Sequence, residues 1–211
     1  MKVHDLGIHY REGTSDEWVI DEVFKDQVYA IDLPEPPKII VDIGANIGVS
    51  AIYFAKKYPD AKIYAFEPQS ENYHLMLLNV IHYPNIIPSR YAIYDERGTF
   101  KLFAAAESHK HGYSLLGRDS PHEPVECIPL PDWMAENKID RIGLLKIDCE
   151  GVENKIFQSL GPALDKIHAV VGEIHGADNW PLVDLLNRSG FEVSAPPTEN
   201  TFSAKRRLPP G

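Results

Sequence analysis

Short apolar runs alternate with stretches of helical spacing in the first half of the chain. A β-branched run at residues 39–43 leads into a glycine-containing turn, followed by about ten residues with apolar positions at helical intervals. The pattern recurs as a strand at residues 62–67 and a helix that opens near Ser70. This alternation predicts an α/β fold with a mostly parallel sheet and helices on both faces.

The helix near Ser70 carries Tyr73, Leu77 and Val80 on one face, which we expect to be buried. Later in the chain, further apolar runs predict additional strands and one late helix. The strands are expected at residues 86–93, 99–103, 125–129, 142–149, 168–175 and 191–194, and the helix at residues 180–189.

The chain of 211 residues suits a single domain, residues 1–211. Residues 1–38 are mixed and polar and close on three prolines, which favour a linker into the regular core at residues 39–204. The proline-rich, basic residues 205–211 are expected to form a flexible tail. Residues 104–123 have the composition of a loop, either a mobile loop on the substrate side or an ordinary surface excursion.

Twenty-one basic residues against thirty-one acidic ones give a net charge of −10. Such a chain repels polyanions, so we expect no binding to nucleic acid or to an anionic membrane. A small-molecule partner is favoured instead, and the chain could also form a homodimer. The hydrophobic content of 44% is that of an ordinary globular protein rather than a disordered one.

The cysteines and the N-terminal residues indicate the cellular compartment in which the protein is expected. Cys127 and Cys149 form no CxxC pattern, and Cys149 lies inside a strongly apolar, strand-like run, so it is expected to be a buried thiol rather than a metal ligand or half of a disulfide, which fits a reducing compartment. The first residues lack the apolar core of a secretion signal, and no stretch approaches the about 18 apolar residues of a membrane span. We therefore expect a cytoplasmic protein.

The turn at residues 42–48 follows the first strand of the predicted sheet, at the edge where ligands of parallel sheets bind. Gly44 and Gly48 would let the backbone approach a ligand closely, and Asn46 could cap the following helix. Asp42 could meet a cation such as an ammonium group.

Glu67 ends the second strand, where a carboxylate can accept both hydroxyls of a ribose. The glycine spacing Gly44-x-x-x-Gly48 lacks a dinucleotide fingerprint, so nicotinamide and flavin dinucleotides are disfavoured. S-adenosylmethionine, a nucleoside with an amino-acid tail, suits these groups better. The simpler alternative is a turn that merely joins a strand to a helix.

Four segments occur in a characteristic order along the chain, VDIGANIGVSAIYFA (41–55), IYAFEP (63–68), LLKIDCEGVE (144–153) and VVGEIH (170–175). Together they resemble the FkbM-type S-adenosylmethionine-dependent methyltransferases. Residues 11–16 and 112–115 are weaker matches to the same family.

This resemblance implies a Rossmann-like class I methyltransferase fold with seven strands, in which residues 39–204 are catalytic and residues 1–38 lie on the substrate side. It implies O-methylation, often of sugars or glycosides, so the expected acceptor is a glycan or glycoside. The residues expected at the cofactor are Asp42, Gly44, Ala45, Asn46, Gly48, Glu67, Pro68 and Asp148.

Strand alternation places Lys146 and Asp148 on one face with Glu150 just beyond, and pairs Glu173 with His175 on the neighbouring strand. We expect these groups to converge, because ionisable residues at the ends of apolar strands are costly to bury without a function. The alternative is that Lys146 and Asp148 form only an internal ion pair.

An acceptor hydroxyl must lose its proton, and His175 is the preferred base because its ordinary pKa lies nearest neutrality, with Asp148 and Glu150 as alternatives. Asp148, Glu173 and His175 could instead hold Mg²⁺, although a metal-free route is preferred. If neither holds, the next candidates are Arg11, Asp16 and the loop histidines His109 and His111, which are otherwise expected at the surface. Trp133 and Trp180 are expected to be packing residues.

Two other functions remain open from the residues alone. One is an NAD-dependent oxidoreductase on a Rossmann-like sheet, and the other is a relative that binds the ligand without turnover.

Overall fold

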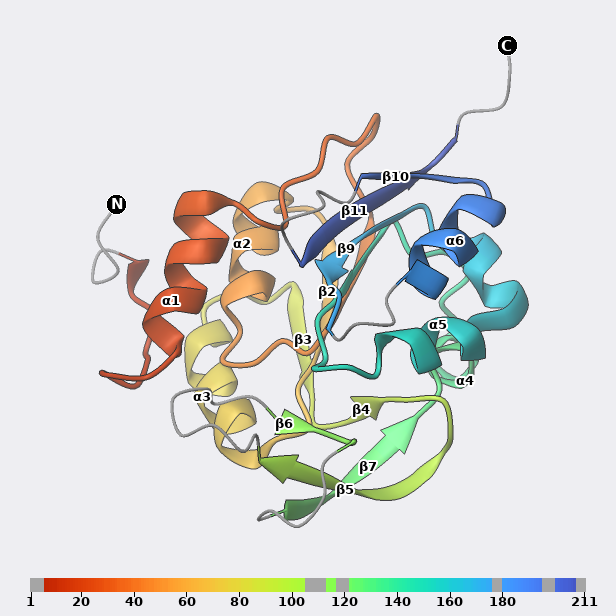
Figure 1. The fold of residues 1–211 in the computed structure, drawn as a ribbon. Helices are drawn as coiled ribbons and strands as arrows, with labels where there is room; N and C mark the ends of the chain where they lie inside the picture. Colours follow the sequence, from red (N-terminus) through yellow and green to blue (C-terminus); the bar gives the residue numbers. More distant parts are fainter. Residues whose placement is uncertain (1–5, 105–112, 117–121, 176–179, 195–199, 208–211) are drawn as a thin grey trace.

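A sheet of seven strands runs through the middle of the computed structural model, with helices on both faces (Figure 1). The structure describes residues 6–104, 113–116, 122–175, 180–194 and 200–207. The strands of this sheet, in spatial order, are β10 (Phe191–Ser194), β11 (Thr201–Arg206), β9 (Ala169–Glu173), β8 (Leu144–Ile147), β1 (Ile39–Ile43), β2 (Lys62–Phe66) and β3 (Ile86–Ser89). Only β11 runs antiparallel to its neighbours, so the predicted fold class is confirmed.

Helices cover the two faces of the sheet in two groups. On one face lie α1 (Asp16–Asp21), the π-helical turn η2 (Glu22–Asp26), α2 (Val49–Lys57) and α3 (Ser70–Val80). On the other lie α4 (Leu130–Glu136), α5 (Glu153–Leu160), the 3₁₀ turn η3 (Gly161–Lys166) and α6 (Trp180–Arg188). None of the helices in the described ranges is long and apolar enough to cross a membrane.

Side-chain alternation along the central strands gives each face its own hydrophobic core. Ile40 and Leu144 point towards α1, α2 and α3, whereas Val41 and Leu145, one position further along each strand, point towards α4, α5 and α6. Because both faces are covered, these strands read as continuous apolar runs.

A second, smaller sheet of four strands packs against the second core, and it contains the strands expected at residues 99–103 and 125–129, although the sequence did not indicate a separate sheet. Its strands in spatial order are β4 (Ala92–Ile93), β7 (His122–Ile128), β5 (Gly98–Ala104) and β6 (Tyr113–Ser114). The expected strand at residues 86–93 is in fact two strands, one in each sheet. Trp133 is buried edge-on against Tyr64 and Phe66, which confirms its packing role.

The expectation of a flexible tail from residue 205 is wrong for Lys205 and Arg206, which belong to β11. The Arg206 guanidinium donates hydrogen bonds to the backbone carbonyls of Leu164, Ile167 and Ser189. An arginine that satisfies three carbonyls at the end of a strand is a structural anchor, so the basic composition of this segment does not indicate a frayed end.

The predicted buried face of α3 is wrong at Leu77, which is 37% exposed, whereas Val80 is buried as expected and Tyr73 is partly buried. Met76 and Asn79 are buried beside Val80. The register of the helix is set by polar contacts that hydrophobic spacing does not reveal. The Asn79 side chain accepts from the backbone N–H of His9 and donates to the carbonyls of His9 and Ile47.

A second asparagine of α3 completes the attachment of the N-terminal segment. Arg11 donates from its guanidinium to the Asn72 side chain, and to both carboxylate oxygens of the completely buried Asp16. Residues 9–16 are therefore fixed on the α2–α3 side of the sheet, where they lead the chain into α1 and η2.

Gly172 in β9 provides a test of the strand packing. A Cβ atom at this position would lie 1.9 Å from the backbone oxygen of Ile147 in β8, so Gly172→Ala should lower the free energy of unfolding by about 2 kcal/mol or more. A suitable control is Gly13→Ala, where none of the described residues lies within 4 Å of the added Cβ atom and only a positive φ of 72° opposes the substitution. That control should cost about 1 kcal/mol. If urea unfolding gave the same loss of unfolding free energy for both variants, the close packing of β8 against β9 at Gly172 would be contradicted.

Candidate active site

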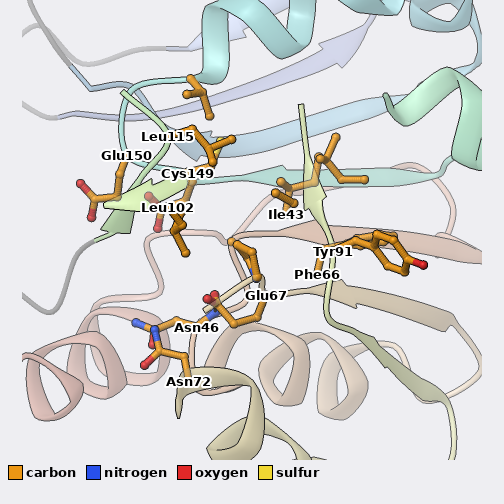
Figure 2. Close-up of a pocket in the computed structure, with 16 residues that line it drawn as sticks. Ile43, Asn46, Phe66, Glu67, Asn72, Tyr91, Leu102, Leu115, Cys149 and Glu150 are labelled. Carbon is orange, nitrogen blue, oxygen red and sulfur yellow. Dashed lines mark hydrogen bonds between the residues drawn. The ribbon is translucent and has the colours of Figure 1, made fainter. Parts of the chain in front are cut away.

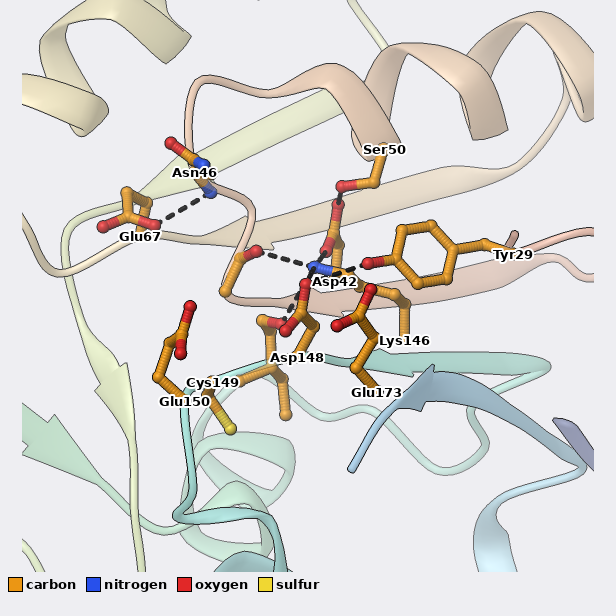
Figure 3. A network of polar contacts seen from close by, with 12 residues as sticks. Tyr29, Asp42, Asn46, Ser50, Glu67, Lys146, Asp148, Cys149, Glu150 and Glu173 are labelled. Carbon is orange, nitrogen blue, oxygen red and sulfur yellow. Dashed lines mark hydrogen bonds and ion pairs between the residues drawn. The ribbon is translucent and has the colours of Figure 1, made fainter. Parts of the chain in front are cut away.

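A buried ion pair joins β1 and β8 at the edge where the site lies (Figure 3). The parallel register places Asp42 directly beside Lys146, on the face covered by α1 and α2. Lys146 Nζ lies 3.1 Å from Asp42 Oδ1 and donates to the carbonyl of Gly44 at 2.6 Å, and Ser50 Oγ donates to Asp42 Oδ2 at 2.6 Å. The pair ties the glycine turn to the neighbouring strand.

This arrangement is the internal ion pair that the sequence left as an alternative, with Asp42 rather than Asp148 as the closest partner of Lys146. The sequence predicts that Asp42 meets a ligand cation. In the structure Asp42 is completely buried, so its carboxylate is not exposed to a ligand. Burial lowers the pKa of Lys146, but the charges of Asp42 and Asp148 outweigh it and raise the pKa above its usual value. Lys146 is therefore a permanent ammonium group that positions the turn.

Gly44 is required for the packing of its turn against the loop after β8. Its φ is +75°, and a Cβ atom there would lie 1.8 Å from the backbone oxygen of Asp148. The turn after β1 and the loop after β8 are thus in direct contact, so Gly44 sets how closely these two walls of the site approach each other.

The expected helix cap at Asn46 is not formed. Gly48 is the N-cap residue of α2, and no side chain caps that helix. Asn46 has a left-handed φ of 51°, and its buried side-chain oxygen has no hydrogen-bond partner within the described structure. Because buried polar atoms are nearly always hydrogen-bonded, this oxygen marks a position where a ligand donor fits.

Glu67 lies directly after β2, as expected, with both carboxylate oxygens oriented by the backbone. Oε2 accepts from the N–H of Asn46 at 2.8 Å, and Oε1 accepts from the N–H of Gln69 at 2.9 Å. Burial raises the pKa of Glu67 to about 7, although these two hydrogen bonds and the Lys146 charge lower it. Each oxygen keeps a free lone pair, which is what a vicinal diol requires.

Glu67 and Pro68 lie in the wall of a first cavity together with Asn46 and Asn72 (Figure 2). The rest of its lining is mainly apolar and comes from both sheets and the loops beyond β8. These apolar residues include Ile43, Phe66, Ile93, Leu102, Leu115 and Val152. A slot with one carboxylate and an apolar floor suits a nucleoside.

A second cavity lies on the side of the N-terminal segment. Its outer wall is formed by Trp18, Glu22 and Tyr29, and its inner wall by the ends of β8 and β9 and by the turn that includes Ala45. The two cavities share Gly44, Asn46, Asp148 and Glu150. These shared residues mark the place where ligands in the two cavities would meet.

His175 lies at this end of the sheet among four carboxylates, as the strand alternation predicts. Its Nδ1 is 2.9 Å from Glu153 Oε1, and its Nε2 is 3.6 to 3.8 Å from oxygens of Asp148, Glu150 and Glu173. Burial lowers the pKa of His175, but the Glu153 hydrogen bond and the carboxylate charges raise it to about 9. The ring is therefore an imidazolium at neutral pH, which argues against His175 as the general base.

The pKa of Glu173 is also raised, but for a carboxyl group this favours the neutral form. Burial and the charge of Asp148 raise the pKa of Glu173 to about 7, although His175 and Lys146 lower it. Asp148, Glu173 and His175 each offer one ligand atom, and these atoms lie within 4.8 Å of one another. The same three groups could thus hold a divalent cation if His175 gave up its Nε2 proton.

Several residues of the site are absent from the sequence-based candidates, among them Glu153 and Tyr29. Glu153 is the last residue of the LLKIDCEGVE segment, so its position in that segment was an available signal. Tyr29, whose hydroxyl donates to Asp148 Oδ2 at 2.8 Å, lies in a segment without a motif. Arg11 and Asp16 form an ion pair of 2.8 Å and line neither of the two cavities. His109, His111 and the Trp180 side chain lie outside the described residues.

Comparison with known proteins identifies the family to which the chain belongs. The family model for the methyltransferase FkbM domain matches residues 42–193. The 31-O-demethyl-FK506 methyltransferase FkbM of Streptomyces tacrolimicus is 28% identical, over 85% of this chain and 83% of that protein. The hexuronic acid methyltransferase AglP of Haloferax volcanii is 26% identical, over 74% of this chain and 64% of that protein.

Longer proteins also contain a related domain. The AMB antimetabolite synthetase AmbE of Pseudomonas aeruginosa is 28% identical over 84% of this chain, which spans only 11% of that protein. A crystal structure of methyltransferase FkbM from Methylobacillus flagellatus KT has a TM-score of 0.62 at 15% identity, over 88% of this chain and 47% of that one. Because the family model spans well over half of the sequence, the chain belongs to the methyltransferase FkbM domain family and is an S-adenosylmethionine-dependent methyltransferase.

Proposed function

We propose that the protein methylates a hydroxyl group of a sugar, glycoside or similar small molecule. The observation that carries the proposal is the meeting of the two cavities at Asp148 and Glu150, because a transfer reaction needs donor and acceptor sites that touch. The names of two relatives, a 31-O-demethyl-FK506 methyltransferase and a hexuronic acid methyltransferase, agree with an oxygen acceptor on a polyhydroxylated compound.

The first cavity is proposed to bind the cofactor, which supplies an electrophilic methyl group when bound. The donor set fits, since Glu67 can accept both ribose hydroxyls and the unpaired Asn46 oxygen can accept one further donor. The apolar lining suits the adenine ring. Asp148 and Glu150 border this cavity on the side of the second one.

The second cavity is proposed to bind the acceptor. Trp18 lines it and is 63% exposed, which offers a flat aromatic surface to the apolar face of a sugar ring. Glu22, Glu150 and Glu173 provide carboxylate acceptors for hydroxyl groups. The net charge of −10 favours such a neutral or cationic molecule over nucleic acid.

The acceptor proton is proposed to move to an oxygen of Glu173. Its pKa of about 7 suits a base at neutral pH, and it lies in the wall of the second cavity. The neighbouring imidazolium of His175 stabilises the ionised carboxylates and holds its proton through the contact with Glu153. In this proposal His175 orients the base instead of acting as the base.

Cofactor binding should depend on ionised Glu67. Glu67→Gln should weaken S-adenosylhomocysteine binding by about 10- to 100-fold in calorimetry, because it removes charged acceptors from the ribose. Wild-type affinity should fall as pH decreases through about 7, where Glu67 gains a proton between the charges of Lys146 and Asp42. Glu71→Gln, an exposed carboxylate in the first turn of α3, is the control and should bind normally. Unchanged affinity in folded Glu67→Gln would refute the ribose assignment.

Acceptor binding should depend on Trp18. With an acceptor identified by mass analysis of products from a panel of glycosides, Trp18→Ala should raise the acceptor KM about tenfold or more and leave the cofactor KM unchanged. Leu78→Ala is a suitable control, because Leu78 is 56% exposed on α3 and lines neither cavity. A wild-type acceptor KM in Trp18→Ala would remove the second cavity as the acceptor site.

Mutation of Glu173 and treatment with EDTA distinguish general-base catalysis by Glu173 from catalysis by a bound metal ion. If Glu173 is the base, Glu173→Gln should lower kcat about 10²-fold, EDTA should have no effect, and wild-type kcat should rise with pH through about 7 as Glu173 ionises. If instead EDTA abolishes turnover and Mg²⁺ restores it, Asp148, Glu173 and His175 act as metal ligands. Full activity of Glu173→Gln would contradict both mechanisms for this residue.

A further inference from the structure

Tyr29 joins the N-terminal segment to the centre of the site. Its hydroxyl donates to Asp148 Oδ2 at 2.8 Å across 119 positions of sequence, and the residue is only 5% exposed. Figure 3 shows the ring beside the Lys146 ammonium group, which lies 5.3 Å from the ring centroid. The hydroxyl is therefore held against one particular oxygen of one carboxylate.

The backbone before Tyr29 has the irregular geometry needed to place it there. The π-helical turn η2 ends at Asp26, and its C-cap residue Gln27 adopts a left-handed φ of 57°. Backbone hydrogen bonds from Val28 N–H to Glu22 O and from Ala30 N–H to Gln27 O then close a tight turn around Tyr29. A π-helical turn is unusual and often occurs at functional sites.

Asp148 lies where the two cavities meet, and its orientation has few other restraints. It follows β8 rather than lying within it, and its side chain is one-quarter exposed. The other charged groups near its carboxylate are at longer distances, with Lys146 Nζ at 3.9 Å and His175 Nε2 at 3.8 Å. Among the contacts that the described residues make with the Asp148 side chain, the hydrogen bond from Tyr29 is thus the short polar one, and it fixes this carboxylate.

We propose that Tyr29 is a positioning residue for methyl transfer, which holds Asp148 in the orientation that the junction of the two cavities requires. This inference rests on the proposed function, because Asp148 borders both of the cavities that are proposed to bind the cofactor and the acceptor. Tyr29 itself is not proposed to exchange a proton with the acceptor. Its removal should therefore affect turnover much more than binding of the cofactor, whose expected contact with Glu67 lies in the first cavity alone.

The test compares Tyr29→Phe with wild type, because phenylalanine keeps the ring and removes only the hydroxyl. We expect kcat to fall tenfold or more, while the dissociation constant for S-adenosylhomocysteine stays within about twofold. Tyr53→Phe is the matched control, since Tyr53 is a buried tyrosine of the same hydrophobic core that lines neither cavity. It should leave both quantities unchanged. A purely structural role of the Tyr29 hydroxyl would lower the unfolding midpoint without this separation between kcat and binding.

Asp148→Asn shows whether Tyr29 acts through Asp148. In that background, Tyr29→Phe should lower the remaining kcat by less than threefold, because the charged acceptor of its hydrogen bond is gone. Wild-type kcat in Tyr29→Phe, or full multiplication of the two effects, would overturn the inference. Failure of the wild-type protein to bind S-adenosylhomocysteine would refute the proposed function instead, so the two failures are distinguishable.

Discussion

The buried ammonium group of Lys146 holds the two most important loops of the site in one arrangement. It bridges the Asp42 carboxylate on β1 and the carbonyl of Gly44, while the Gly44 backbone lies against the loop that carries Asp148. Two ions removed from water are costly unless they are paired and hydrogen-bonded, and here each finds its partner through the parallel register. Loss of either partner would leave an uncompensated charge in the core and release the turn that shapes both cavities.

The remaining charge at the site is unbalanced. The imidazolium of His175 is surrounded by four carboxylates, those of Asp148, Glu150, Glu153 and Glu173. The nearby charge of Lys146 does not balance them, because it is already matched by Asp42. The high pKa of His175 and the raised pKa of Glu173 are two results of this excess of carboxylates. The region therefore favours cationic and hydrogen-bond-donating ligands, and it retains a proton on the histidine that a simpler environment would release.

The sequence predicts what depends on local periodicity and on strand topology. It predicts the parallel sheet, Glu67 at the end of β2 and the convergence of Asp148, Glu173 and His175, because alternation and the shared edge of parallel strands determine these positions. It does not predict the buried face of α3, where Asn79 replaces Leu77 through contacts with residues far away in the chain. Nor does it identify Tyr29 or the protonation state of His175, since both depend on groups that only tertiary structure brings within a few ångströms.

The position of β11 has a consequence for biosynthesis. This strand follows every other strand of the sheet in the chain, yet it lies between β9 and β10. Within the sheet, β10 pairs with β11 alone, so it cannot join the sheet before β11 exists. While the chain is still on the ribosome, β9 presents an open edge that could pair with other strands. Assembly of this sheet during synthesis can thus proceed only as far as β9 until the chain has emerged as far as Arg206.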